Sequence, residues 1–154
     1  MKTRSIALTI VVCLAGLTLC FAESSIMGTW KLNEAKSKFS PGAPKNHTVV
    51  YEAAGDNIKV TVDGVDAQGK PTHSEWTGKF DGKDYPLTGD PTSDSRSYKK
   101  VNGNTMDLTN KKDGKATVTA RIVVSADGKT RTVTLHATDA KGKKISETAV
   151  YDKQ

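Results

Sequence analysis

Residues 113–138 read DGKATVTARIVVSADGKTRTVTLHAT and decide the fold of this 154-residue chain. Each Asp-Gly pair begins a run rich in Thr and Val, and Asp-Gly supplies the positive φ angles that tight hairpins need. A two-residue turn at 127–128 aligns the runs with apolar residues facing each other at three of four positions. These pairs are Val118–Ala137, Ala120–Leu135, Ile122–Val133 and Val124–Arg131. The stretch therefore predicts two antiparallel strands that share one buried face.

The same pattern of short strands and turns extends over most of the chain. A turn centred on Lys141 predicts a third aligned strand, which places Tyr151 opposite Arg131 and Ala149 opposite Val133. Asn33 to Asn46, with Pro41 and Pro44, reads as a loop. The predicted strands are 28–32, 48–53, 57–62, 71–80, 85–88, 95–101, 105–111, 115–125, 130–138 and 143–152.

Two further loops are predicted from register. A three-residue loop at 112–114, with Gly114 left-handed, aligns Leu108 with Val118, whereas a two-residue turn places Leu108 on the wrong face. A three-residue loop at 102–104 aligns Tyr98 with Leu108 and turns Tyr98 inward.

Short antiparallel strands in chain order leave two exposed sheet edges unless the sheet closes on itself. We therefore predict an all-β fold, an antiparallel up-and-down β-barrel of eight to ten strands. A β-sandwich is the alternative.

Residues 1–22 predict a secretory signal peptide. Lys2 and Arg4 precede an apolar run over 6–21, and Ala22 is the small residue expected at a cleavage site. The run is shorter than the roughly 20 residues of a spanning helix. We expect a secreted or periplasmic protein that is not inserted in a membrane after cleavage.

The segment that follows is one domain, 23–154. Both cysteines, Cys13 and Cys20, precede it, so the domain folds without disulfides. Leu19 stands before Cys20, where a lipoprotein signal has a small residue, which argues against a lipid anchor.

Composition gives little support for a catalytic or metal site. The histidines at 47, 73 and 136 lack the close spacing of a zinc site. No serine lies in a Gly-x-Ser-x-Gly elbow. We expect no enzyme activity, no metal and no cofactor.

The formal net charge of +6 comes from many separate lysines. Lysine pairs at 99–100, 111–112 and 143–144 form a basic surface if their hairpin ends meet at one rim, and such a surface binds polyanions. Lysines on strands more commonly protect against aggregation. We expect no nucleic-acid partner.

Gly28-Thr29-Trp30, the meander of hairpins and Tyr151 resemble the calycin superfamily, which comprises lipocalins and fatty-acid-binding proteins. The segments 28–39 and 133–153 also resemble uncharacterised secreted bacterial lipocalin-like proteins. The resemblance implies a barrel that binds a small apolar ligand.

Two features of the sequence depart from the pattern of fatty-acid-binding proteins. Fatty-acid-binding proteins have a pair of helices between the first two strands, whereas 33–46 is too short and too rich in proline, so no helical lid is expected. Those proteins also hold the ligand carboxylate with an Arg two residues before the terminal Tyr. Here that residue is Ala149, before Tyr151.

Arg131, opposite Tyr151 in the predicted register, replaces that arginine in our hypothesis. Arg131 and Tyr151 bind a ligand carboxylate, and the lumen contains further ligand-binding side chains. The alternative is that Arg131 stacks on Trp30 and closes the barrel floor with its head in water. The full set of predicted ligand-binding residues is Arg131, Tyr151, Trp30, Trp76, Tyr98 and Leu135.

These features together predict a secreted, monomeric, non-catalytic binding protein. Its ligand is small and hydrophobic or amphipathic, for example fatty-acid-like, and lies in the barrel lumen. One alternative is a solid barrel that acts through its basic surface at the cell envelope. Another is an enzyme of unknown reaction.

Overall fold

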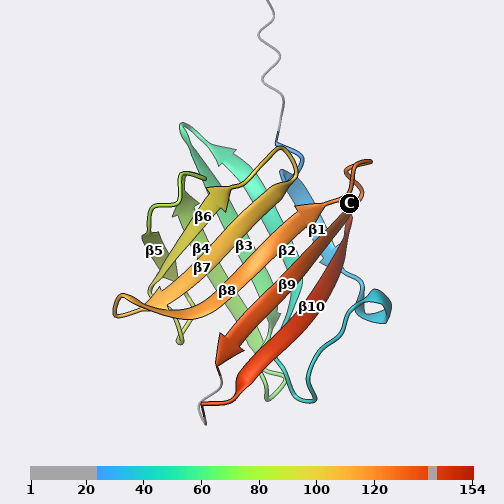
Figure 1. The fold of residues 1–154 in the computed structure, drawn as a ribbon, viewed down its shortest axis with the longest axis vertical. Helices are drawn as coiled ribbons and strands as arrows, with labels where there is room; N and C mark the ends of the chain where they lie inside the picture. Colours follow the sequence, from blue (N-terminus) through green and yellow to red (C-terminus); the bar gives the residue numbers. More distant parts are fainter. Residues whose placement is uncertain (1–23, 139–141) are drawn as a thin grey trace, which may run out of the picture.

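Ten antiparallel strands form a closed barrel in chain order, with β1 beside both β2 and β10 (Figure 1). The computed structural model describes residues 24–138 and 142–154. The predicted barrel is therefore confirmed and the sandwich is excluded. The elements are β1 (Gly28–Leu32), the 3-10 helix η1 (Glu34–Lys36), β2 (Lys45–Ala54), β3 (Asn57–Val65), β4 (Pro71–Gly78), β5 (Tyr85–Thr88), β6 (Ser95–Lys100), β7 (Thr105–Lys112), β8 (Lys115–Val124), β9 (Thr130–Thr138) and β10 (Lys144–Lys153).

The register predicted for the last three strands is confirmed. Val118 pairs with Ala137 and Val124 with Arg131, while Arg131 also pairs with Tyr151. Lys141, the centre of the predicted last turn, lies outside the described residues. The pairing of Tyr98 with Leu108 is confirmed as well, and Tyr98 is 1% exposed.

The three-residue loop at 112–114 is wrong. Asp113 and Gly114 have φ angles of 50° and 74°, as in a two-residue type I′ turn, and Lys112 pairs with Lys115. The register then shifts between Asn110 and Lys111 through a β-bulge, with Thr117 as the extra residue. The bulge moves Leu108 opposite Ala120 instead of Val118 and returns it to the inner face.

The turn at 127–128 also differs in type, although its register holds. The amide of Ser125 donates to the carbonyl of Thr130, and the amide of Gly128 donates to the carbonyl of Ser125. Asp127 lacks the positive φ that a type I′ turn requires, so a four-residue loop over 126–129 connects β8 and β9.

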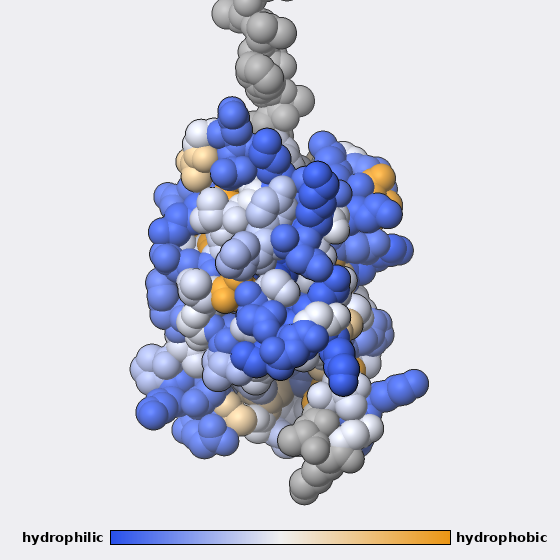
Figure 2. Space-filling view, turned by 90° about the vertical axis from the view of Figure 1, so that its left-hand side faces the viewer, coloured by the Kyte–Doolittle hydropathy of each residue, from blue (hydrophilic) through white to orange (hydrophobic). Residues whose placement is uncertain are grey.

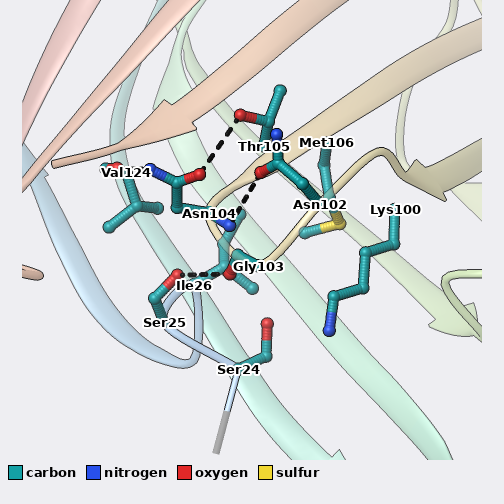
Figure 3. Close-up of a pocket in the computed structure, with 10 residues that line it drawn as sticks. All are labelled: Ser24, Ser25, Ile26, Lys100, Asn102, Gly103, Asn104, Thr105, Met106 and Val124. Carbon is teal, nitrogen blue, oxygen red and sulfur yellow. Dashed lines mark hydrogen bonds between the residues drawn. The ribbon is translucent and has the colours of Figure 1, made fainter. Parts of the chain in front are cut away.

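One end of the barrel, the upper end in Figure 1, is sealed by residues 24–27 and the loop 102–104. We call it the closed end. The indole of Trp30 donates to the carbonyl of Ile26 at 2.7 Å, and the hydroxyl of Ser25 donates to the carbonyl of Gly103 at 3.2 Å. The pocket left between these segments is only about 10 Å³ (Figure 3). It has room for one water molecule at most.

The core fills the barrel towards this closed end with aromatic side chains. Trp76 contacts Tyr98 edge-on at 4.8 Å and stacks on Phe80 at 6.4 Å. Its indole donates to the carbonyl of Arg96 at 2.8 Å. The buried apolar residues are Ile26, Trp30, Val49, Tyr51, Val60, Val62, Trp76, Leu87, Tyr98, Met106, Ala120, Ile122, Val124, Val150 and Tyr151.

Gly78 makes this aromatic packing possible, because a Cβ there would lie 2.5 Å from the Tyr85 ring and 2.7 Å from the Trp76 ring. Gly78→Ala is expected to lower the free energy of unfolding by about 1–3 kcal/mol through overpacking. Chemical denaturation measures the change. Gly103→Ala is the control, since nothing lies within 4 Å of a Cβ at Gly103, and we expect a change below about 0.5 kcal/mol. Equal effects of the two substitutions would contradict this packing.

On the outer face of β3 and β4, His73 Nδ1 lies 2.6 Å from Asp63 Oδ1 and Nε2 lies 3.7 Å from Glu75 Oε1. The hydrogen bond to Asp63 raises the pKa of His73, so this pair stabilises the fold fully below the unfolded pKa of histidine. The contribution is lost as the pH rises through the raised, folded-state pKa. An NMR titration is expected to place the His73 pKa above its ordinary value, and Asp63→Asn to lower it. An unchanged His73 pKa in that variant would refute the assignment.

Candidate functional site

Towards the other end, which we call the open end, the inner wall of the barrel is only half-buried. The register aligns a row of inward residues across β6 to β10, namely Arg96, Asn110, Val118, Ala137 and Ile145. Val118, Ala137 and Ile145 are partly exposed although they point inwards. The lumen is therefore accessible on this side.

A cavity of about 630 Å³ opens there, at the ends of β8, β9 and β10. These are the lower ends of β9 and β10 in Figure 1. This volume lies within the range typical of small-molecule sites. The cavity is lined by Ala116, Thr117, Val118, Thr119, His136, Ala137, Thr138, Lys144, Ile145 and Ser146. Val118, Ala137 and Ile145 belong to the inner face, whereas Thr119, His136 and Ser146 pair with one another on the outer face, so the cavity extends around the strand ends.

Deeper in the barrel, Arg131 of β9 is 2% exposed and surrounded by aromatic rings. Its guanidinium carbon lies 4.2 Å from the ring centroid of Tyr151 and 5.7 Å from that of Trp30. Nη1 donates to the Tyr51 hydroxyl at 3.0 Å, whereas Nε is buried with no hydrogen-bond partner. Among residues 24–138 and 142–154, no carboxylate forms an ion pair with Arg131. Within these residues the buried cation therefore has no counter-ion.

Arg96 of β6 is a second inward arginine, 8% exposed. Its Nε donates to Asn110 Oδ1 at 2.7 Å and its Nη1 to the Tyr98 hydroxyl at 3.4 Å. Both acceptors are uncharged. Within the described part of the chain, Arg96 likewise has no carboxylate partner.

Two tyrosines connect the arginines. Tyr51 contacts Arg131 at 5.5 Å and Tyr98 at 6.1 Å, and Tyr98 contacts Arg96 at 5.9 Å. We call Arg131, Tyr51, Tyr98 and Arg96 the Arg–Tyr chain. Burial, together with neighbouring Tyr98, raises the pKa of Tyr51 and outweighs the opposing effect of Arg131. The Tyr51 phenol therefore stays protonated and remains able to donate a hydrogen bond.

Tyr151 shows the same balance. Burial raises the pKa of its hydroxyl, and the nearby positive charge of Arg131 opposes this shift. Tyr151 is 3% exposed and its ring faces the guanidinium group of Arg131. It is a neutral partner of Arg131 and does not neutralise the charge.

The structure brings some of the predicted site residues together and separates others. Arg131, Tyr151 and Trp30 form one group near the closed end. Trp76 and Tyr98 belong to the aromatic cluster of the neighbouring wall, and Leu135 lies half-buried on β9 opposite Ala120 and Glu147. Whether these residues bind a ligand stays a prediction.

The alternative proposed for Arg131 is corrected in one respect. Its guanidinium does lie over Trp30, but with 2% exposure the head does not reach water. Sequence reasoning missed Arg96 and Tyr51. The signal was available for Arg96, since it lies two residues from Tyr98 on the same strand and must share its face.

The three lysine pairs do not meet at one rim. Lys99 and Lys100 end β6 at the closed end, next to the loop 102–104, whereas β7 carries Lys111 and Lys112 to the opposite end. The outer surface seen in Figure 2 is hydrophilic with scattered hydrophobic residues. A single basic rim formed by all three pairs is therefore excluded.

Residues 24–138 and 142–154 contain no group of three or more His, Cys, Asp or Glu side chains that could hold a metal ion. No helix in this part of the chain is long and apolar enough to cross a membrane.

Comparison with known proteins supports the fold. No protein-family model matches the sequence, and neither does any curated protein. Among solved structures, the chain is similar to EF1p2_mFAP2b, a structure described as bound to DFHBI, with 10% identity and a TM-score of 0.51. The match covers 84% of this chain and 94% of that one. The likeness and the ten-stranded barrel are consistent with the calycin fold.

The hydrogen bond from Arg131 to Tyr51 is expected to matter for stability. Tyr51→Phe removes the acceptor and leaves Nη1 of a buried guanidinium unsatisfied, which should cost about 1–3 kcal/mol in chemical denaturation. Tyr85→Phe is the matched control, because its hydroxyl donates to the exposed carboxylate of Asp81. We expect less than about 1 kcal/mol there. If the Tyr51 variant proved as stable as the wild type, Arg131 would not depend on this acceptor.

Proposed function

We propose that this protein is a secreted or periplasmic, non-catalytic binding protein for a small amphipathic acid held in the barrel lumen. One observation supports this most strongly. The lumen encloses two guanidinium groups that have no carboxylate partner among the described residues, and a cavity of about 630 Å³ opens at the other end of β9, with Ala137, six residues after Arg131, in its lining.

The physical argument concerns charge. A guanidinium group stays charged in proteins, and burying an ion without a counter-ion is costly. Aromatic faces and phenol oxygens reduce this cost only in part. An anionic ligand would supply the missing charge and accept hydrogen bonds from Arg131.

The apolar wall suits the rest of such a ligand. Arg131, Val133, Leu135 and Ala137 alternate with outward residues along β9 and lead from the closed end to the cavity. A hydrocarbon chain lying along this strand would have its acidic end at Arg131 and its tail at the open end.

Two further observations support parts of the proposal. The structurally similar barrel EF1p2_mFAP2b is described as bound to the small molecule DFHBI. Secretion rests on the sequence of residues 1–22 alone. N-terminal sequencing of the protein from its own host is expected to begin at Glu23, and a chain that still begins at Met1 would contradict cleavage.

The binding experiment compares decanoic acid with methyl decanoate by calorimetry. We expect Arg131→Met to weaken decanoic acid by roughly tenfold to hundredfold, because a charge-assisted hydrogen bond is lost. The ester should be little affected.

Arg121→Met is the control, since Arg121 lies on the outer face, paired with Asp107 at 2.8 Å. It should change neither affinity. Equal losses of acid and ester in Arg131→Met would show that the carboxylate does not bind Arg131. Failure of the wild type to bind either compound would contradict the proposed function.

A further inference from the structure

We propose that the ligand of this lumen is a diacid, with one anionic group bound by Arg131 and the other by Arg96 together with Asn110. This inference rests on the proposed function and names its ligand class. It depends on Arg96, which lies on β6, whereas Arg131 lies on β9.

Arg96 is built into the barrel as a fixed, buried donor. Arg96 Nε donates to Asn110 Oδ1 at 2.7 Å. The backbone carbonyl of Arg96 accepts from the indole of Trp76 at 2.8 Å. Because Asn110 uses its oxygen on Arg96, its amide nitrogen is left as a further donor. The pair therefore offers several N–H groups and a positive charge, with 8% and 6% exposure respectively.

The register connects this pair to the cavity. Arg96 pairs with Asn110, Asn110 with Val118, and Val118 with Ala137. Val118 and Ala137 line the cavity of about 630 Å³. A molecule in that cavity lies against the same row of inward side chains that Arg96 and Asn110 extend.

A single carboxylate is not expected to serve both arginines. The contacts of the Arg–Tyr chain run from Arg131 to Tyr51, then to Tyr98, then to Arg96. Two aromatic rings thus lie between the guanidinium groups, and each of these three steps is 5.5 to 6.1 Å. Binding a monoacid at one end leaves the cation at the other end buried and unpaired.

The acceptors of the chain are uncharged. Tyr51 accepts from Arg131 and Tyr98 accepts from Arg96, and both acceptors are phenol oxygens. Glu147, the one acid on the inner row next to Leu135, accepts from the amide of Ser40 at 3.2 Å and does not pair with either arginine. Two acidic groups would supply both the acceptors and the charge.

The test uses three probes with the same ten-carbon acyl chain: sebacic acid, its monomethyl ester and decanoic acid. Calorimetry of the wild type is expected to show sebacic acid binding roughly tenfold or more tightly than either monoacid, as one more charge-assisted interaction allows. In Arg96→Gln, the three affinities should agree within about threefold, and Arg121→Gln should retain the preference.

Asn110→Asp provides a second, nearly isosteric variant in case Arg96→Gln does not fold. It places a carboxylate 2.7 Å from Arg96 Nε in the position of the amide oxygen, so Arg96 is neutralised within the protein. The preference for the diacid should disappear while decanoic acid still binds.

The outcomes separate this inference from the proposed function. Equal binding of all three probes to the wild type would overturn the diacid while leaving an acid-binding lumen. A preference for sebacic acid that persists in both Arg96→Gln and Asn110→Asp would show that Arg96 is not the second site. Failure of every acid to bind would contradict the proposed function itself.

Discussion

Closure of an alternating sheet is the constraint on which this structure depends. Side chains of a pleated strand point alternately into the lumen and to solvent, so about every second residue lies inside the barrel whatever its chemistry. Most of these positions carry apolar or aromatic residues. Arg96 and Arg131 occupy two of them, so the barrel encloses two cations that are 8% and 2% exposed.

The two ends of the barrel differ: side chains fill one end, and a cavity opens at the other. Residues 24–27 seal the closed end over Trp30, and the aromatic cluster fills the space below it. At the open end the inner-face side chains Val118, Ala137 and Ile145 are small or aliphatic, and they form part of the cavity lining. Arg131 thus lies deep in the barrel, whereas Arg96 lies on the row of inward residues that reaches the open end.

Much of the fold follows from the sequence, because turn glycines and strict alternation fix both strand ends and register. For β9 and β10, the pairing of Arg131 with Tyr151 could be predicted residue by residue. The bulge at Thr117 could not, since a bulge needs no special residue and compensates a turn elsewhere. The site was predicted only in part. Alternation implies that Arg96 lies inside with Tyr98, but the presence of Asn110 and Tyr51 beside the arginines depends on contacts across strands that a single strand pattern does not contain.

The central claim is that this lumen holds an acid through its buried arginines. Native mass spectrometry of protein purified from its own host, at neutral pH, measures this most directly, because it weighs the protein together with whatever lies in the lumen. The account predicts an added mass that is released as an organic acid and that is absent from the Arg131→Met protein purified in the same way. A neutral lipid in the lumen, or the same added mass on the Arg131→Met protein, would contradict it.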